Sequence, residues 1–311
     1  MDTALVTGGA GFIGSHLVEK LLGSGLRVRV LDNLSTGHVS NLPISNRAFS
    51  LIEGDIRDPL TVRKALEGMD ALFHLAALSS VPRSLAEPLE TGSINLGGTI
   101  TLLEAARDCG VKRFVFTSSA AVYGDVKTLP VREDSPLNPT NPYGADKMAC
   151  EQHLSLFSRQ HGMKTFAFRL FNVYGPRQNP DSPYSGVVSR FIATAIKGWP
   201  VEIFGDGRQT RDFVFVSDVV DVLAKSLEMP VSIAEPVNVG SGEPTSLLRL
   251  AETLEQALGR SIEKVFKEPR AGDIIHSVAS IERLRSVFGV KSLVSLADGL
   301  RETVNSVDAR L

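Results

Sequence analysis

The chain has 311 residues, which is enough for one large α/β domain or two modest domains with a real core. Its 33 basic and 35 acidic residues give a net charge of −2, which disfavours a polyanionic partner such as nucleic acid. Two cysteines cannot form a disulfide framework, which points to a reducing compartment. No apolar run approaches the roughly 18 residues of a membrane span, and no signal-peptide pattern precedes the first strand. We therefore expect a soluble, cytoplasmic protein without membrane contact.

Short apolar segments alternate with amphipathic segments through the first half of the chain. The strand-like segments are residues 4–7, 27–32, 49–55, 70–77, 112–119 and 164–172. The helix-like segments between them are residues 12–23, 61–67, 97–109 and 143–160. This alternation predicts an α/β fold with a Rossmann-type, doubly wound parallel sheet.

Residues 7–16, TGGAGFIGSH, follow the first predicted strand and open the first predicted helix. Gly8, Gly11 and Gly14 permit a tight turn, close approach of a pyrophosphate and tight packing of helix on strand. The start of the helix adds amide groups and a dipole for the phosphates. A glycine fingerprint alone is weak evidence, but here it has the strand, turn and helix that the motif requires. Phe12 and Ile13 lie inside this predicted cofactor site.

Asp32 ends the second predicted strand, 18 residues after Gly14. A carboxylate there can hold the ribose hydroxyls of adenosine, and no arginine follows it to accept a 2′-phosphate, so the sequence favours NAD over NADP. Taken alone, Asp32 could be a turn residue at a strand end, but its position beside the glycine fingerprint favours the ribose contact. Asp55 and Ile56, after the third strand, would suit the adenine edge. The other predicted cofactor contacts are Asn33, Ser35, Thr36, Gly37, Leu75, Ala76, Ala77, Asn95, Ser118 and Phe171.

Residues 142–147, PYGADK, place Tyr143 and Lys147 one helical turn apart. The preceding pair Asn141-Pro142 is typical of a helix start. A phenol titrates near pH 10, but an ammonium on the same helix face and the positive helix end would lower that pKa and favour a base. An ordinary aromatic residue beside a solvated lysine explains these six residues equally well.

The pattern changes after residue 172. A loop rich in Pro, Gly and Ser is predicted at 175–186, and long loops in compact domains are often functional. Helices at 187–197, 218–228 and 246–258 follow, and then a tail rich in polar turns. We predict an NAD-binding domain over residues 1–171, to which part of 212–240 returns, and a smaller α/β substrate domain over 172–311, with a cleft between them.

Eight segments carry a resemblance that covers nearly the whole chain. They are TGGAGFIGSH, GDIRD (54–58), HLAALSSVPRS (74–84), TSSAAVYG (117–124), PYGADK, RLFNVYGPRQNP (169–180), GDGRQTRDFVFVSD (205–218) and RAGDIIHS (270–277). In their order and spacing these segments resemble the extended short-chain dehydrogenase/reductases, specifically the nucleotide-sugar 4-epimerases. The resemblance implies a Rossmann domain, NAD retained between turnovers and an isomerase that interconverts UDP-glucose and UDP-galactose.

The resemblance also implies roles for particular residues. Tyr143 would be the base for the sugar 4-hydroxyl, Lys147 would keep it ionised and bond the nicotinamide ribose, and Ser119 would orient the hydroxyl. Alternatively, Ser119 could be a residue at a strand end whose hydroxyl only forms local hydrogen bonds. The implied substrate contacts are Asn172, Arg211 and Arg270 for the diphosphate, Asp273 for the uridine ribose, and Ser80, Arg83 and Gln178 for the sugar. No metal site is predicted.

The choice of sugar depends on a few departures from related families. The 4,6-dehydratases carry Asp-Glu where this chain has Ala120-Ala121, and UDP-glucuronate 4-epimerases usually carry an arginine where it has Asn179. Ser277 replaces a bulky tyrosine that often walls the pocket, so we expect UDP-GlcNAc and UDP-GalNAc to be accepted as well. The alternatives are a UDP-glucuronate 4-epimerase, another enzyme of the same family acting on nucleotide sugars, or a non-catalytic NAD-binding regulator. Relatives of this kind dimerise through two helices per subunit, placed here at 97–109 and 144–160.

Overall fold

The computed structural model describes residues 1–179, 186–230, 232, 235–269 and 274–308. The chain divides into two compact units, each built from several segments of sequence. The first unit comprises Met1–Gly124, Pro136–Arg169 and Val220–Val237. The second comprises Asp125–Ser135, Leu170–Val219 and Asn238–Leu311.

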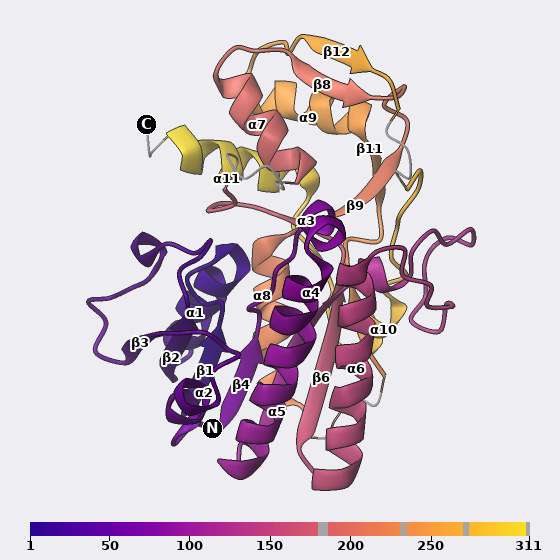
Figure 1. The fold of residues 1–311 in the computed structure, drawn as a ribbon. Helices are drawn as coiled ribbons and strands as arrows, with labels where there is room; N and C mark the ends of the chain where they lie inside the picture. Colours follow the sequence, from indigo (N-terminus) through magenta and orange to yellow (C-terminus); the bar gives the residue numbers. More distant parts are fainter. Residues whose placement is uncertain (180–185, 231, 233–234, 270–273, 309–311) are drawn as a thin grey trace. The chain divides into compact units, whose positions relative to one another are not determined.

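A seven-stranded sheet has the order β10-β6-β5-β4-β1-β2-β3 (Figure 1). Its strands are β1 Thr3–Thr7, β2 Arg27–Asp32, β3 Phe49–Glu53, β4 Ala71–His74, β5 Arg113–Ser119, β6 Lys164–Leu170 and β10 Val237–Val239. β1 pairs in parallel with both β2 and β4, and β4 pairs in parallel with β5. The predicted Rossmann-type parallel sheet is confirmed. The winding reverses beside β1, and ligands of open α/β sheets bind at such reversals.

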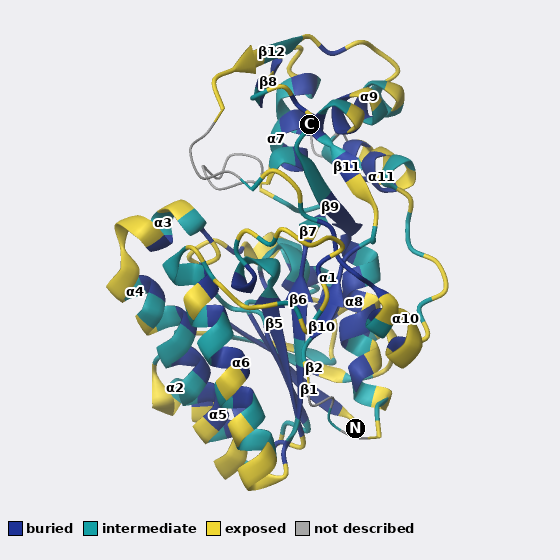
Figure 2. Ribbon diagram, turned by 90° about the vertical axis from the view of Figure 1, so that its right-hand side faces the viewer, coloured by how far each residue is buried: buried dark blue, intermediate teal, exposed yellow. Residues whose placement is uncertain are grey.

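Helices cover both faces of this sheet. They are α1 Phe12–Gly23, α2 Pro59–Leu66, α5 Gly98–Asp108, α6 Pro142–His161 and α8 Val216–Lys225. Figure 2 shows α2, α5 and α6 on one face and α1 and α8 on the other. On the first face, strand residues such as Leu72 and Phe114 are buried in one core with Leu102 of α5 and Leu154 of α6.

Shorter helices follow β4 and β5. α3 Val81–Ala86 and α4 Pro88–Gly92 lead into a π-helical turn at Ser93–Gly97, which continues directly into α5. The 3-10 turns are Val39–Asn41, Ala120–Val122 and Ser226–Glu228. Such π-helical turns are rare and occur often at functional sites.

The second unit holds a three-stranded sheet of order β11-β9-β7 and a parallel pair β12-β8. Its elements are β7 Asn172–Tyr174, α7 Val187–Ile196, β8 Val201–Phe204, β9 Thr210–Phe215, β11 Pro244–Ser246, α9 Leu247–Leu258, β12 Lys264–Lys267, α10 Glu282–Phe288 and α11 Leu296–Asp308. The expectation of a tail of polar turns was wrong, because α10 and α11 lie there. α11 buries only a narrow stripe that includes Leu300 and Val304, so its composition is mostly polar. Within the described ranges, no helix is both long and apolar enough to span a bilayer.

Candidate active site

The glycine-rich turn joins β1 to α1 and is closed to side chains. Gly8 has φ of 69°, and a Cβ atom there would lie 2.7 Å from the Ala76 nitrogen. A Cβ atom on Gly14 would lie 2.1 Å from the Gly8 oxygen. Gly11 precedes α1, whose first amides receive no side-chain cap. The turn therefore offers backbone amides in a space that only glycines leave open, which fits a dinucleotide pyrophosphate.

Asp32 is buried at the end of β2, beside this turn. Its Oδ2 accepts a hydrogen bond from Ala10 N at 2.9 Å, and its Oδ1 accepts one from Leu34 N at 2.9 Å. A carboxylate has about four lone-pair positions, so two backbone bonds leave capacity for ribose hydroxyls. Gly37 is buried against Ala10 in the loop that follows. The predicted contacts Asn33, Ser35 and Thr36 are exposed in the same loop.

Asp55 is held by an arginine that the sequence analysis missed. Arg57 donates to it from Nε at 3.0 Å and from Nη2 at 2.7 Å, and it also pairs with Glu90 at 3.0 Å. The Arg57 hydrogen bonds hold the pKa of the Asp55 carboxyl below its ordinary value. The spacing Asp-x-Arg in GDIRD could have indicated this pair. Ile56, predicted as a cofactor contact, is buried in the core and packs against Gly98.

Asn95 supports the loop after β4. Its side chain is buried in the π-helical turn, where Oδ1 accepts from Leu78 N at 2.8 Å and Nδ2 donates to Leu78 O at 3.1 Å. Earlier in this loop, Leu75 N donates to Thr7 O at 3.1 Å and Ala76 N donates to Thr7 Oγ1 at 3.3 Å. These bonds fix residues 75–77 against the glycine turn, and Asn95 holds the next residue, Leu78, in place.

Ser119, Tyr143 and Lys147 come together at the end of β5 and the start of α6. The Asn141 side chain accepts from Gly144 N at 2.9 Å and caps α6, which places Tyr143 as its second residue. The Ser119 hydroxyl interacts with the Tyr143 phenol and favours its ionised form. Lys147 Nζ donates to Thr117 O at 2.7 Å and lies 5.9 Å from the centre of the Tyr143 ring.

The protonation of this pair differs from the prediction. Burial raises the pKa of Tyr143, and the hydrogen bond with Ser119 only partly opposes this effect. Burial also lowers the pKa of Lys147 to about 8. The expected lowering of the phenol pKa was therefore wrong for the chain by itself, because desolvation of the phenol outweighs the influence of a lysine bound to Thr117 O.

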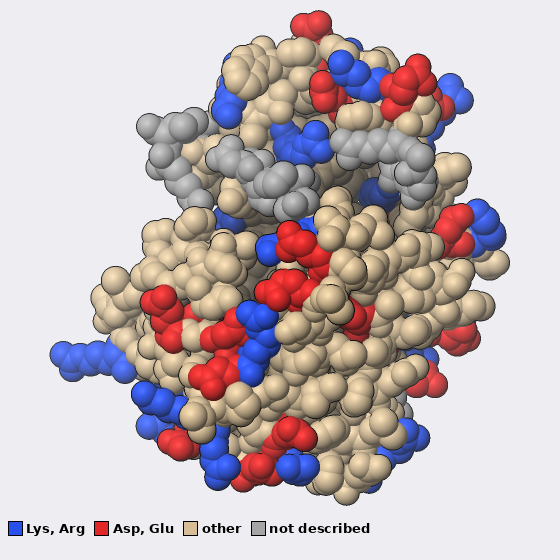
Figure 3. All heavy atoms as spheres, in the orientation of Figure 1, with Lys and Arg blue, Asp and Glu red and all other residues tan. Residues whose placement is uncertain are grey.

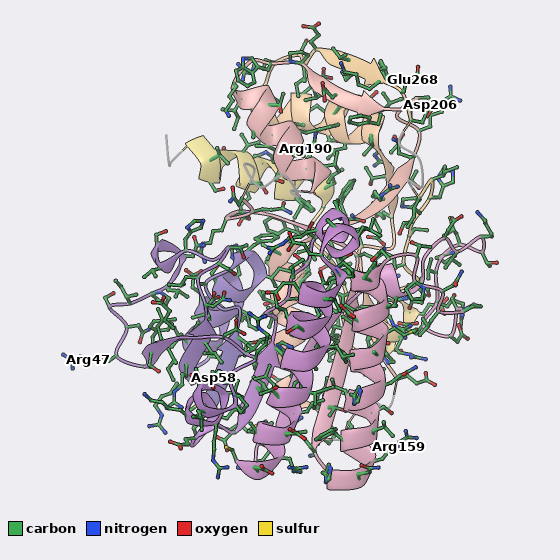
Figure 4. All side chains as sticks on the ribbon, in the orientation of Figure 1. Arg47, Asp58, Arg159, Arg190, Asp206 and Glu268 are labelled. Carbon is green, nitrogen blue, oxygen red and sulfur yellow. The ribbon has the colours of Figure 1, made fainter. Side chains whose placement is uncertain are left out.

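The second unit contains a pocket of about 420 Å³. Asn172 opens β7 and Arg211 lies on the neighbouring strand β9, so pairing of these strands brings the two predicted diphosphate contacts to one wall. The residues that line the pocket are Asn172, Val187, Arg190, Phe191, Thr194, Trp199, Pro200, Glu202, Phe204, Gln209, Arg211 and Leu247. Arg190 lies on α7 (Figure 4). Volume and lining suit a small polar ligand with an aromatic or apolar part.

The other predicted substrate residues are divided between the two units. In the first unit, Ser80 caps α3 by accepting from Arg83 N at 3.0 Å, and Arg83 Nε pairs with Glu87 at 2.9 Å. In the second unit, Ser277 is half-buried and its N donates to Thr210 O at 3.2 Å.

Gln178 and Ser277 are not among the residues that line the 420 Å³ pocket. Phe171 is buried, and its N donates to Val239 O at 2.9 Å. Arg270 and Asp273 lie outside the described residues. No group of His, Cys, Asp or Glu among the residues that the structure describes is arranged to hold a metal ion.

Comparison with known proteins shows the family of this chain. Residues 4–240 match the NAD dependent epimerase/dehydratase family. The UDP-glucose 4-epimerase of Mycolicibacterium smegmatis is 41% identical over 304 residues, which are 96% of each chain. The structure of the Thermus thermophilus UDP-glucose 4-epimerase in complex with NAD is 38% identical, with a TM-score of 0.90 over 99% of this chain and 100% of that chain.

A third relative acts on an acetylated sugar. The UDP-N-acetylglucosamine 4-epimerase of Methanobrevibacter ruminantium, solved with UDP-N-acetylmuramic acid, is 36% identical, with a TM-score of 0.95 over 100% of this chain and 99% of that chain. The curated relatives are thus isomerases, and the glycine turn with Asp32 matches the cofactor in the family name. The chain belongs to the NAD dependent epimerase/dehydratase family, among the extended short-chain dehydrogenase/reductases, and is an enzyme whose cofactor is NAD.

Proposed function

We propose that this enzyme is a UDP-sugar 4-epimerase that interconverts UDP-glucose and UDP-galactose. The observation that carries the proposal is the cluster of Ser119, Tyr143 and Lys147, in the same unit as the glycine turn. The similarity to two UDP-glucose 4-epimerases over nearly the whole chain supports it.

In this proposal Tyr143 is the acid and base of the reaction. Its phenolate takes the proton of the sugar 4-hydroxyl, and the phenol returns that proton to the 4-oxygen after the 4-keto sugar has turned over. NAD, which the glycine turn and Asp32 would hold, would supply the hydride acceptor and then the hydride donor for C4, so the overall reaction would gain and lose no electrons or protons. Ser119, which bonds the phenol, orients the reacting hydroxyl.

Lys147 supplies the charge that Tyr143 needs. Because burial lowers the pKa of Lys147 only to about 8, most of the lysine is protonated at pH 7. A positive charge near the phenol favours the phenolate and opposes part of the effect of burial, which raises the phenol pKa. Asn172 and Arg211 would bind the substrate diphosphate, since an arginine fork makes paired, charge-assisted bonds to phosphate oxygens.

The test is a two-way conversion assay. Purified enzyme incubated with UDP-glucose should form UDP-galactose, and enzyme incubated with UDP-galactose should approach the same ratio of the two sugars, as measured by HPLC. A constant ratio from both sides shows epimerisation at equilibrium. Absence of conversion in both directions, with NAD still bound, would favour the non-catalytic regulator. A 4-keto-6-deoxy product would indicate a dehydratase.

We also propose that the enzyme accepts N-acetylated sugars. Ser277 is small at a position where relatives specific for plain hexoses often carry a tyrosine beside the sugar, and the similarity to a UDP-N-acetylglucosamine 4-epimerase supports this choice. Ser277→Tyr should suppress turnover of UDP-GlcNAc and largely spare UDP-glucose, because a close-packed wall would clash with the acetyl group. Equal loss on both sugars, or a wild type that ignores UDP-GlcNAc, would disprove it.

UDP-glucuronate is the weaker candidate substrate. The position that would pair with its carboxylate is Asn179, which has no positive charge. Including UDP-glucuronate in the same HPLC panel tests this alternative directly, and its conversion at a rate comparable to UDP-glucose would reverse the preference.

A further inference from the structure

Three residues of α6 form a stripe that faces the end of β5. Tyr143, Lys147 and Glu151 follow one another at intervals of four residues, so they share one side of the helix. Each interacts with a different one of three consecutive β5 residues. Lys147 Nζ donates to Thr117 O at 2.7 Å, Ser118 Oγ donates to Glu151 Oε1 at 2.5 Å, and the Ser119 hydroxyl favours the ionised form of the Tyr143 phenol.

Glu151 is the buried anion of this arrangement. Arg169 of β6 donates to it from Nε at 3.0 Å and from Nη2 at 2.7 Å, and the two side chains are only 4% and 6% exposed. The same arginine donates from Nη1 to the Tyr123 hydroxyl at 2.8 Å, in the turn that follows β5. One ion pair therefore connects α6, β6, the end of β5 and the turn after it.

Stability alone does not explain a buried pair of this kind. Desolvation of two charges offsets most of their attraction, and apolar residues of similar size often serve a fold equally well. A buried charged network does fix one geometry, because its members cannot shift without losing bonds. This pair fixes the segment that carries Ser119 against the helix that carries Tyr143.

We propose that Glu151 is a positioning residue for the reaction. Held by Arg169, it fixes Ser118 and so sets the register of the β5 end on α6, which aligns the Ser119 hydroxyl with the Tyr143 phenol. Its loss would misalign the reacting groups without weakening substrate binding. The inference rests on the proposed function, in that Tyr143 is taken as the reacting group.

Ser118→Ala is the decisive variant, because it removes the bond to Glu151 and leaves the ion pair intact. We expect turnover per bound NAD to fall roughly tenfold, with KM within about twofold of wild type, since small misplacements of reacting groups lower rates by one to two orders of magnitude. Ser118→Thr retains the hydroxyl and should restore most of the turnover. Because turnover is divided by the amount of bound NAD, unfolded protein, which binds no NAD, does not lower the measured value.

Tyr123→Phe is the matched control. It removes one hydrogen bond from the same arginine but none between β5 and α6, so it should lower the melting temperature and leave turnover per bound NAD unchanged. Unchanged turnover in Ser118→Ala, a raised KM in place of a lowered kcat, failure of Ser118→Thr to restore turnover, or an equal loss in Tyr123→Phe would each overturn the proposal.

A second readout separates this inference from the proposed function. If wild type converts no UDP-sugar, the proposed function fails, and the alignment is then measured by ultraviolet titration of Tyr143, taken as the difference from Tyr143→Phe. Because the Ser119 bond lowers the phenol pKa, Ser118→Ala should move this titration to higher pH. An unmoved titration in that case would overturn the positioning role.

Discussion

Lys147 holds a charge that its surroundings disfavour. Its side chain is 3% exposed, and burial lowers its pKa from 10.5 to about 8, although Cys150, Glu151 and Asp146 oppose the shift. The unfolded chain therefore binds this proton more tightly than the folded chain. Buried Lys147 therefore lowers the free energy of unfolding below about pH 8, and this loss of stability disappears as the pH rises towards 10.5. A shift of this size corresponds to roughly 3 kcal/mol.

The variant Lys147→Met should show how much stability the buried charge costs. Methionine keeps an unbranched apolar side chain and removes the charge, so nucleotide-free variant should melt above nucleotide-free wild type at pH 7 and lose turnover. The difference in melting temperature should shrink between pH 8 and 10. Circular dichroism across this range checks the prediction, with exposed Lys291→Met as the control. A difference that is independent of pH would contradict it.

Tyr143 offers the most direct test of the chemistry. Tyr143→Phe removes one hydroxyl and keeps the ring contacts, so folding and bound NAD should be retained. Turnover should fall by about 10²–10⁴-fold, which is the usual contribution of a general base. Steady-state kinetics with UDP-glucose measures the loss, and nucleotide released on denaturation serves as the control. A variant with nearly wild-type turnover would remove Tyr143 from the mechanism.

Some residues of the site could be predicted from sequence and others could not. Tyr143 and Lys147 were recognisable because a turn of helix fixes their spacing. Glu151 continues the same spacing and was missed, since its partner Arg169 is 18 residues further on and no local pattern links them. The phenol pKa was predicted in the wrong direction because burial, which dominates it, depends on packing that a hexapeptide does not reveal.

At the scale of the element, the ends of a long helix were predictable where the sequence contains recognisable capping residues. Asn141-Pro142 begins α6 and Gly162, with φ of 68°, ends it, one or two residues from the predicted bounds. α3 and α4 were not predicted, although Ser80 caps α3 and each helix has a proline in its first turn, because helices of six and five residues are too short to show a helical period. The π-helical turn has no side-chain cap and was not predicted either. α11 was missed because a helix with one narrow buried stripe resembles a polar loop in composition.

The start of α1 gives a prediction about an element. Gly14→Ala would place a Cβ atom 2.1 Å from Gly8 O, which must displace the turn that joins β1 to the helix. The variant should lose bound NAD and melt several degrees lower. Gly23→Ala in the last turn of the same helix has nothing within 4 Å of the new Cβ atom and should keep both properties. Nucleotide content and thermal melts compare the pair, and equal behaviour would contradict the steric argument.

At the scale of the whole molecule, contacts between distant segments set the limit of prediction. Asn172 and Arg211 were named from their motifs, and both line the pocket in the second unit. Arg190, Trp199 and Glu202 line the same pocket but were not predicted, because only the folding of α7 against β8 brings them there. Trp199 is the single tryptophan of the chain, so its fluorescence offers a direct test of whether UDP binds in this pocket.

The homodimer that the family resemblance implies stays a prediction, and the outer surface of α6 offers a way to test it. Leu156 is 42% exposed on this helix, half-buried Met148 and Ala149 lie about two turns before it, and Figure 3 shows mostly uncharged atoms over α6. In the predicted homodimer this surface would pack against α5 and α6 of a second copy. Light scattering after size exclusion should give twice the 33.5 kDa of one chain.

Leu156→Glu tests which surface forms the dimer. Two carboxylates brought into one apolar, two-fold interface would have no partners, so the variant should run as a monomer while retaining bound NAD. Leu60→Glu is the matched control, because Leu60 is 80% exposed on α2, outside the two predicted interface helices, and its replacement should leave the dimer unchanged. A monomeric wild type would refute the dimer. A Leu156→Glu dimer would instead place the interface on another surface.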